Sequence, residues 1–285
     1  MTLSRLERDL LRYLAEDRFG HDVTSKAVIP TDLVAVGELV AQEKGIVSGV
    51  LAATRLAKNV GVRVTAHVKD GATVRPGQRI VTLEGYARTI LGVERTLANL
   101  VMHLSGIATE TNRMVQAAKS VNPRFRIAAT RKTLPGLRDL EKQAVMHGGG
   151  EPHRRDLSSA ILIKGNHAAM VGFTRALLAS KRYASKHELE LMVEVSTEDE
   201  AVAAASAGAR RLLLDNLTPP GVRKIVDRLK AEGLRNRVTL EVSGGITLKN
   251  VKPFAMSGAD IASSGHLTHS APALSMHLVI SRCRK

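Results

Sequence analysis

The sequence has little cysteine and few aromatic residues. Cys283 is the single cysteine, so no disulfide can form within the chain and a cysteine-based zinc site is not favoured. A lone cysteine suits a reducing compartment, and we expect a cytoplasmic protein. Aromatic residues make up 2% of the chain and tryptophan is absent, which leaves few rings for the bases of single-stranded nucleic acid to stack on. The core must then consist of Ala, Val, Leu and Ile, a composition that suits parallel strands covered by helices.

Long hydrophobic runs are also missing. No run of about 18 apolar residues occurs, so the sequence predicts no membrane span. The first residues, Met1 to Asp9, are charged and have a helical pattern, which does not match a signal peptide.

The length and charge of the chain limit the remaining possibilities. With 285 residues it is too long for one minimal domain and too short for two large ones, so we expect one barrel-like domain and a smaller partner. Lys and Arg total 42 against 27 Asp and Glu, a net charge of +15 that favours anionic partners. Phosphorylated small molecules, nucleic acid and a merely basic solvated surface all stay open at this point.

The first part of the chain predicts a small α+β layer and a long helix. Residues 1–35 read as a helix followed by a loop, and residues 36–85 as short strands around a helix at 50–60. Residues 88–118 carry apolar side chains at helical spacing, although Gly106 could interrupt that helix. Arg95 lies off the apolar stripe, so it faces solvent or a partner.

From about residue 124 strands and helices alternate, which predicts a parallel sheet. Helices are expected at Thr197–Ala207 and Pro220–Glu232. The segment is shorter than the roughly 250 residues of a full (β/α)8 barrel, so an incomplete barrel or an open doubly wound sheet is expected. The six predicted strands are Phe125–Thr130, Ala160–Ile163, Leu189–Val195, Arg211–Leu214, Thr239–Val242 and Asp260–Ser263.

Ligands of parallel α/β folds bind at the carboxyl ends of the strands. Each strand end here delivers a polar group, although singly most of these residues could be solvated turns or helix caps. Glu194 is the exception, because a carboxylate inside an apolar strand needs a partner or a metal. The candidates at this edge are Arg131, Lys132, Lys164, Glu194, Asp215, Ser243, Gly244, Gly245, Ser264 and Gly265.

The run from Gly148 to Arg155 adds three glycines followed by His153 and Arg154, a loop with a cationic tip. Several cations beside the carboxylates of Glu194 and Asp215 suggest Mg²⁺ bridging a polyphosphate. The glycine-containing turns at Ser243 and Ser264 would bind phosphate. Together these residues predict a cationic site for a polyanionic substrate.

These motifs, in this order, resemble the quinolinate phosphoribosyltransferases over nearly the whole chain. The resemblance rests on Thr130–Arg138, the triple glycine with His153 and Arg154, Leu162–His167 and Leu213–Asn216. It continues in Glu94–Thr96, Leu104–Thr109, Ser243–Ile246 and Leu267–Ser270.

The resemblance implies an incomplete α/β barrel of parallel strands beside an N-terminal α+β sandwich. We expect the sandwich at residues 1–108, with the tail 268–285 returning to it, and the barrel at 109–267. The implied reaction consumes quinolinate and phosphoribosyl pyrophosphate and yields nicotinate mononucleotide, pyrophosphate and CO2, with Mg²⁺ as cofactor. A homodimer or higher homo-oligomer with shared active sites is implied, without nucleic acid or membrane partners.

The resemblance also implies roles for individual residues. Arg131, Lys132, His153, Arg154 and Lys164 would hold the substrate, together with Arg95 of a neighbouring subunit. Glu194 and Asp215 would face the ribose and the metal-bound pyrophosphate, and with Lys164 would be catalytic. Ser243, Gly244, Gly245, Ser264 and Gly265 would bind the 5′-phosphate.

This chain departs from the family pattern at Ala129, at Gly165 and around Ser264, and Gly165 replaces an acid that would neutralise Lys164. One rival is a relative that uses nicotinate without decarboxylation, or a molybdenum-transport-associated homologue. The number of retained cations favours a dicarboxylate instead. An RNA-binding protein would spread its basic residues along a surface stripe. A biotinyl-type carrier hairpin at residues 70–85 lacks a lysine at its tip.

Overall fold

The computed structural model describes residues 4–284, which divide into two compact units. Within the described residues, the first unit comprises residues 4–110, Pro135–Gly148 and residues 271–284, and the second comprises Thr111–Leu134 and Gly149–Ser270. The predicted domain limits stay a prediction, because a single helix runs without a break through residues 108 and 109. No helix in residues 4–284 combines the length and the apolar character needed to cross a bilayer.

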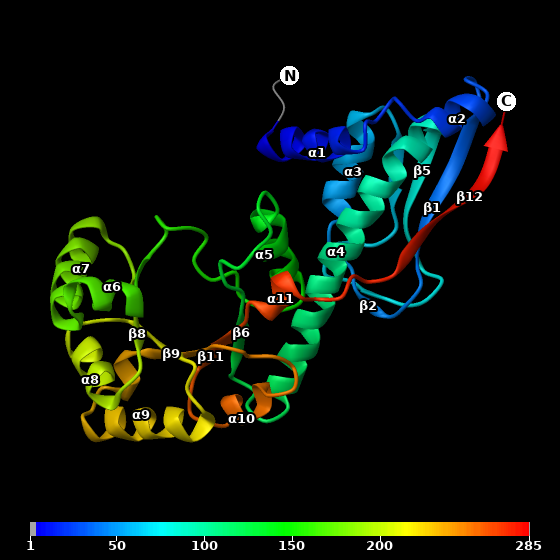
Figure 1. Cartoon of the computed structure of the whole chain (residues 1–285). Helices are drawn as coiled ribbons and strands as arrows, with labels where there is room; N and C mark the ends of the chain where they lie inside the picture. Colours follow the sequence, from blue (N-terminus) through cyan, green and yellow to red (C-terminus); the bar gives the residue numbers. More distant parts are fainter. Residues whose placement is uncertain (1–3, 285) are drawn as a thin grey trace. The chain divides into compact units, whose positions relative to one another are not determined.

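The first unit is built on an antiparallel sheet of four strands in the order β12-β1-β5-β3. Its strands are β1 (Val34–Ala41), β3 (Arg63–Ala66), β5 (Arg79–Tyr86) and β12 (Met276–Arg284), beside the short pair β2 (Gly45–Ile46) and β4 (Thr73–Val74). Buried and half-buried residues alternate along β1, as expected where one face of a sheet covers a core. β12 pairs along the whole of β1, from Val34 opposite Arg284 to Ala41 opposite Met276, so the C-terminal segment completes this sheet (Figure 1).

The helices of this unit are α1 (Arg5–Glu16), α2 (Val23–Val28), α3 (Val50–Asn59) and α5 (Arg138–His147). The prediction of a loop after the first helix is wrong for residues 23–28. There the carboxylate of Asp22 accepts hydrogen bonds from the N–H groups of Thr24 and Ser25 and begins α2.

The long predicted helix is confirmed as α4 (Ala87–Lys119), but Gly106 does not interrupt it. Instead, the missing side chain makes room for the C-terminal segment. A Cβ atom at Gly106 would lie 2.1 Å from the carbonyl oxygen of Pro272. Gly106 therefore allows the backbone at Pro272 to pack closely against α4, and it does not break the helix.

The second unit confirms the predicted parallel sheet, with six strands in the order β6-β11-β10-β9-β8-β7. The strands from β7 to β11 are neighbours in the sheet in the same order as in the chain. β6 pairs with β11 and not with β7. This is the order of a barrel left open between β6 and β7. The strands are β6 (Arg126–Ala128), β7 (Ile161–Ile163), β8 (Leu191–Val195), β9 (Arg211–Asp215), β10 (Thr239–Ser243) and β11 (Ile261–Ser263).

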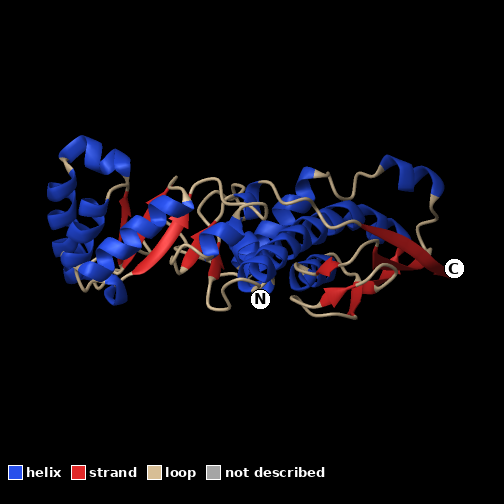
Figure 2. Ribbon diagram, turned by 90° about the horizontal axis from the view of Figure 1, so that it is seen from below, coloured by secondary structure: helices blue, strands red, loops and turns tan. Residues whose placement is uncertain are grey.

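Helices follow most of these strands and surround the sheet (Figure 2). The helices predicted at residues 197–207 and 220–232 are confirmed as α8 and α9. The set is α6 (Gly165–Val171), α7 (Phe173–His187), α8 (Glu198–Ser206), α9 (Pro219–Ala231), α10 (Val251–Ala255) and α11 (His266–His269), with a 3-10 turn at Arg235–Arg237. The buried side chains between strands and helices are almost all aliphatic, as the scarcity of aromatics predicts.

Candidate active site

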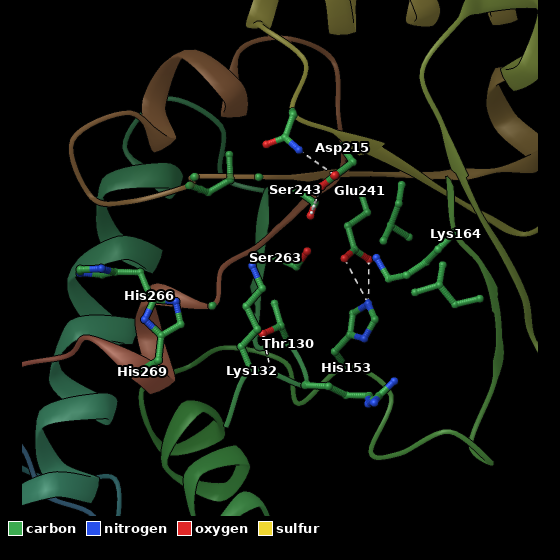
Figure 3. Close-up of a pocket in the computed structure, with 18 of the residues that line it drawn as sticks. Thr130, Lys132, His153, Lys164, Asp215, Glu241, Ser243, Ser263, His266 and His269 are labelled. Atoms are coloured by element: carbon green, nitrogen blue, oxygen red, sulfur yellow. Dashed lines mark hydrogen bonds and ion pairs between the residues drawn. The ribbon is translucent and has the colours of Figure 1, made fainter. Parts of the chain in front are cut away.

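A cavity of about 620 Å³ opens at the carboxyl ends of the barrel strands. Side chains alternate along a strand, so every second residue faces the inside of the barrel. The lining follows that rule: it takes Leu162 from β7 and Lys164 just after it, Leu213 and Asp215 from β9, Glu241 and Ser243 from β10, and Ser263 from β11 with Gly265 two residues later. Figure 3 shows Lys164, Asp215, Glu241, Ser243 and Ser263 around this cavity. The cavity is therefore lined by residues that lie more than 100 positions apart in the sequence, from Thr130 to His269.

Five of the predicted basic residues line this cavity together: Arg131, Lys132, His153, Arg154 and Lys164. Arg131 and Lys132 follow β6, and Lys164 follows β7, the two strands at the opening of the barrel. Both edges of that opening therefore carry positive charge into one cavity.

The loop after the three glycines is held in place by strand β6. The N–H of Glu151 donates to the carbonyl of Ile127 at 2.8 Å, and the N–H of Ala129 donates to the carbonyl of Glu151 at 2.9 Å. These bonds add Glu151 to the free edge of β6. The next residues, including His153 with its positive φ of 56°, are thereby directed into the cavity.

Arg154 and Arg131 lie close enough to repel each other. Partial burial lowers the pKa of the Arg154 guanidinium, and the positive charge of Arg131 lowers it further. Arg154 still donates from Nη1 to the carbonyl of Ala160 at 3.3 Å, whereas the buried Nε of Arg131 has no hydrogen-bond partner within residues 4–284. Two neighbouring guanidinium groups that repel each other favour a bound anion, which would pair with both.

Glu194 lies behind Lys164 and does not itself line the cavity. The ammonium of Lys164 is 2.8 Å from Oε2 of Glu194, and the N–H of Gly165 donates to Oε1 at 3.0 Å. Lys164 is therefore neutralised by a carboxylate on β8, although residue 165 is not acidic.

Asp215 presents a carboxylate at the cavity wall. It accepts hydrogen bonds from Oγ of Ser243 at 2.9 Å and from Nδ2 of Asn216 at 2.8 Å. Oxygen donors of this kind suit Mg²⁺, which is often bound by one or two carboxylates together with substrate phosphates. Within residues 4–284 no three His, Cys, Asp or Glu side chains cluster in a way that could hold a metal ion.

The predicted phosphate-binding residues divide into two groups. Ser243, Gly244, Gly245 and Gly265 line the cavity, and Gly244 and Gly245 have the positive φ angles that favour glycine. Ser264 differs from the prediction, because its hydroxyl is buried and donates to the carbonyl of Ile246 at 2.6 Å, and its N–H donates to the carbonyl of Ala128. Its neighbour Ser263 faces the cavity instead.

Several lining residues were not among the sequence candidates. They are Thr130, Leu162, Leu213, Asn216, Glu241, Ile246, Thr247, Ser263, His266 and His269. The signal for Glu241 was present in the sequence, since it stands between Leu240 and Val242 as Glu194 stands between Val193 and Val195. The two histidines follow the glycine at the end of β11 and gave no separate pattern.

Arg95 belongs to α4 in the first unit, where its side chain is 61% exposed and lies 3.6 Å from the carboxylate of Glu94. It does not line the cavity described above. The prediction that it acts in a neighbouring subunit stays a prediction.

Comparison with known proteins covers almost the whole chain. Residues 22–105 match the model of the quinolinate phosphoribosyl transferase N-terminal domain, and residues 107–279 match that of its C-terminal domain. The chain is 41% identical over 273 residues to a probable nicotinate-nucleotide pyrophosphorylase [carboxylating] of Methanothermobacter thermautotrophicus, covering 95% of this chain and 98% of the relative. Identity to the nicotinate-nucleotide pyrophosphorylase [carboxylating] of Mycobacterium leprae is 40%, over 95% and 96% of the two chains. The crystal structure of NadC from Streptococcus pyogenes superposes with a TM-score of 0.89 at 31% identity, over 100% and 99% of the chains.

Proposed function

The chain belongs to the quinolinate phosphoribosyltransferase family, and on that premise we propose that it transfers the phosphoribosyl group of phosphoribosyl pyrophosphate to quinolinate with loss of CO2. The products are nicotinate mononucleotide, pyrophosphate and CO2, so the enzyme serves NAD biosynthesis. The observation that carries this proposal is the group of five basic residues and the phosphate-type glycine turn in a single cavity. A dicarboxylate and a phosphorylated sugar are the substrates that such a cavity suits.

The half of the cavity near the barrel opening would bind quinolinate. Its two carboxylates would pair with Arg131, Arg154 and Lys164, which all line the cavity. Leu162 and Leu213 belong to a buried apolar cluster and would pack against the flat pyridine ring. Because nicotinate has only one carboxylate, it would leave some of these cations unpaired.

The other half would bind the phosphoribosyl group. The turn at Ser243, Gly244 and Gly245, together with Gly265 after the neighbouring strand β11, would take the 5′-phosphate through backbone N–H groups. Asp215 would face the ribose and, with pyrophosphate oxygens, would hold Mg²⁺. When bound, Mg²⁺ supplies positive charge that stabilises the departing pyrophosphate.

The reaction needs charge stabilisation at two points. When the bond from the ribose carbon to pyrophosphate breaks, the oxygen keeps the electron pair and positive charge develops on the sugar, which the carboxylate of Asp215 would stabilise. The pyridine nitrogen then forms a bond to that carbon. The ring becomes cationic and accepts the electron pair of the adjacent carbon–carboxylate bond, so CO2 leaves and a proton takes its place. Lys164, balanced by Glu194, would orient the departing carboxylate.

The proposal includes the location and assembly of the enzyme. We place it in the cytoplasm, because the single cysteine suits a reducing compartment. We also propose a homodimer or higher oligomer in which Arg95 reaches the cavity of a neighbouring subunit. The support is the exposure of Arg95 on α4, outside its own cavity lining.

Steady-state assays with the purified chain test the function. Quinolinate, phosphoribosyl pyrophosphate and Mg²⁺ are expected to give nicotinate mononucleotide and CO2 in equal amounts. Chelation of Mg²⁺ with EDTA should abolish product formation, and added Mg²⁺ should restore it. Product from nicotinate without any from quinolinate would overturn the proposal in favour of the non-decarboxylating rival.

A further inference from the structure

Glu241 is a buried acid inside the barrel that the function described above does not use. It is the third residue of β10 and lines the cavity, yet its side chain is 0% exposed to solvent. An ionised carboxylate without water costs several kcal/mol unless partners satisfy it. The partners of Glu241 therefore indicate what it does.

Those partners connect the cavity to the interior of the barrel. Nε2 of His153 lies 3.1 Å from one carboxylate oxygen of Glu241 and 3.2 Å from the other, and Nη1 of Arg211 lies 3.1 Å from the second oxygen. Figure 3 shows the His153 ring directed at the Glu241 carboxylate. Arg211 is 17% exposed and its Nε is also 3.4 Å from a carboxylate oxygen of Glu190, which is 40% exposed. The carboxylate of Glu241 thus contacts Arg211 of β9 and also His153, which lines the cavity.

This contact fixes the chemical state of one ring nitrogen. A carboxylate only accepts hydrogen bonds, so Nε2 of His153 must carry the proton that is shared with Glu241. The other nitrogen, Nδ1, is buried and has no hydrogen-bond partner within the described chain. His153 consequently has its ring orientation set by Glu241 and not by a loop contact of its own.

The contact between Glu241 and His153 also affects Arg154, because of where His153 lies in the chain. The residue has a left-handed backbone conformation, with φ of 56°, and it immediately precedes Arg154. Holding the His153 ring therefore also restricts the backbone that places the Arg154 guanidinium. In addition, the negative charge of Glu241 lies among the cations of the cavity and reduces their mutual repulsion before an anion binds.

We propose that Glu241 is a positioning residue for quinolinate: held by Arg211, it orients His153 and with it the carboxylate-binding cations of the cavity. This inference rests on the proposed function. Glu190 is not assigned this role. Its carboxylate contacts Nε of Arg211, but it is 40% exposed and does not line the cavity.

The test compares Glu241→Gln with Glu190→Gln, which removes a charged contact of the same arginine. The wild-type assay with quinolinate comes first, so failure of the proposed function is recognised before any variant is measured. Glu241→Gln is expected to raise the KM for quinolinate about tenfold or more, the effect of losing a charge-assisted hydrogen bond. The KM for phosphoribosyl pyrophosphate should stay within about twofold, and Glu190→Gln should leave both values within about twofold. Equal rises in both KM values for Glu241→Gln would show a merely structural role and overturn the proposal.

A double-mutant cycle with His153→Asn separates positioning from stability. Quinolinate binding is measured by calorimetry without the second substrate, on variants whose thermal unfolding shows a folded protein. If Glu241 acts through His153, the double variant binds quinolinate about as well as His153→Asn alone. Independent, multiplying losses would contradict the proposal.

A spectroscopic measurement on the wild-type protein keeps the inference testable if Glu241→Gln does not fold. The ¹⁵N and ¹H resonances of the His153 ring should show a proton on Nε2 that exchanges slowly with water. A ring with a bare Nε2 would overturn the proposal.

Discussion

The ammonium of Lys164 lies 2.8 Å from the carboxylate of Glu194, and the N–H of Gly165 donates to the other oxygen of the same carboxylate at 3.0 Å. Lys164 directly follows β7, and Glu194 lies on β8, which pairs with β7 in parallel. The charge that residue 165 lacks in this chain is thus supplied by the neighbouring strand. Glu194 orients Lys164 from behind, and its negative charge is close to the cavity without being part of its lining.

Replacing Glu194 by Gln removes this charge while keeping the size of the side chain. We expect kcat to fall about 100-fold, in the range seen when a preorganised electrostatic contact is lost. The measurement is steady-state kinetics with both substrates. Glu198→Gln in the first turn of α8, a residue outside the cavity lining, is the control and should leave kcat unchanged. A raised KM with unchanged kcat would show that Glu194 serves binding alone.

Gly244 and Gly245 provide a matched pair for the phosphate turn. A Cβ atom at Gly244 would lie 2.2 Å from Oδ1 of Asn216, whose amide donates to Asp215, while a Cβ at Gly245 would meet nothing within 4 Å. Gly244→Ala should therefore displace Asn216 and Asp215 and lower kcat/KM for phosphoribosyl pyrophosphate by more than about tenfold, the loss of a displaced contact group.

Gly245→Ala is the control for backbone strain without a steric clash. Gly245 has a φ of 61°, and an L-residue in this left-handed conformation destabilises the protein by roughly 1–2 kcal/mol. We expect Gly245→Ala to lower the unfolding temperature and to leave Asn216 and Asp215 in place, so that its loss of kcat/KM is smaller than that of Gly244→Ala. Similar kcat/KM values for the two variants would contradict the steric argument.

Much of this fold could be predicted because the signals are local. Each barrel strand is a short aliphatic run between helical patterns, and all six appear within a few residues of their predicted places. The polar residues that end those strands follow from the same pattern. The second helix at residues 23–28 was missed, since its signal is one capping Asp22 and no apolar repeat of useful length.

The parts that could not be predicted depend on distant contacts or on one-residue differences. The partner of Glu241 is His153, 88 residues away, and nothing near either residue indicates the pairing. Ser263 and Ser264 are adjacent and chemically identical, and only the exact end of β11 decides which one faces the cavity. Gly106 looks like a helix break in the sequence, but its role is set by Pro272, which lies far along the chain.

The pairing of Glu241 predicts how stability depends on pH. Burial opposes ionisation, but hydrogen bonding and positive charge from His153, followed by Ser263 and Arg211, hold the pKa of Glu241 below its ordinary value of 4.5. The folded state then loses this proton at lower pH than the unfolded state. The stability contributed by the ionised group is present above about pH 4.5 and is lost as the pH falls through the folded-state pKa.

Urea unfolding of wild type and Glu241→Gln between pH 7 and pH 3 measures this contribution. We expect a constant difference in unfolding free energy down to about pH 5, and a shrinking difference below that value. A difference that is the same at every pH would mean that folding does not lower the pKa of the Glu241 carboxyl.

Mixing two inactive variants tests whether Arg95 acts across subunits. Arg95→Ala and Lys164→Ala each damage one component of a shared site. In a mixed dimer, one cavity would combine the intact Lys164 of one subunit with the intact Arg95 of the other, while the second cavity would lack both. Random exchange gives half mixed dimers, each with one intact site, so roughly a quarter of wild-type activity should return.

The control for this experiment is the exchange itself, followed by native mass spectrometry of differently tagged subunits. Each variant mixed only with itself should stay inactive, which excludes reactivation by handling. If the mixed dimers form and activity does not return, Arg95 does not complete the site of its neighbour. The exposed ion pair with Glu94, at 3.6 Å, would then be a surface contact of α4 and nothing more. If activity returns, the cavity of one chain is incomplete by itself, and assembly of subunits is a requirement of catalysis in this protein.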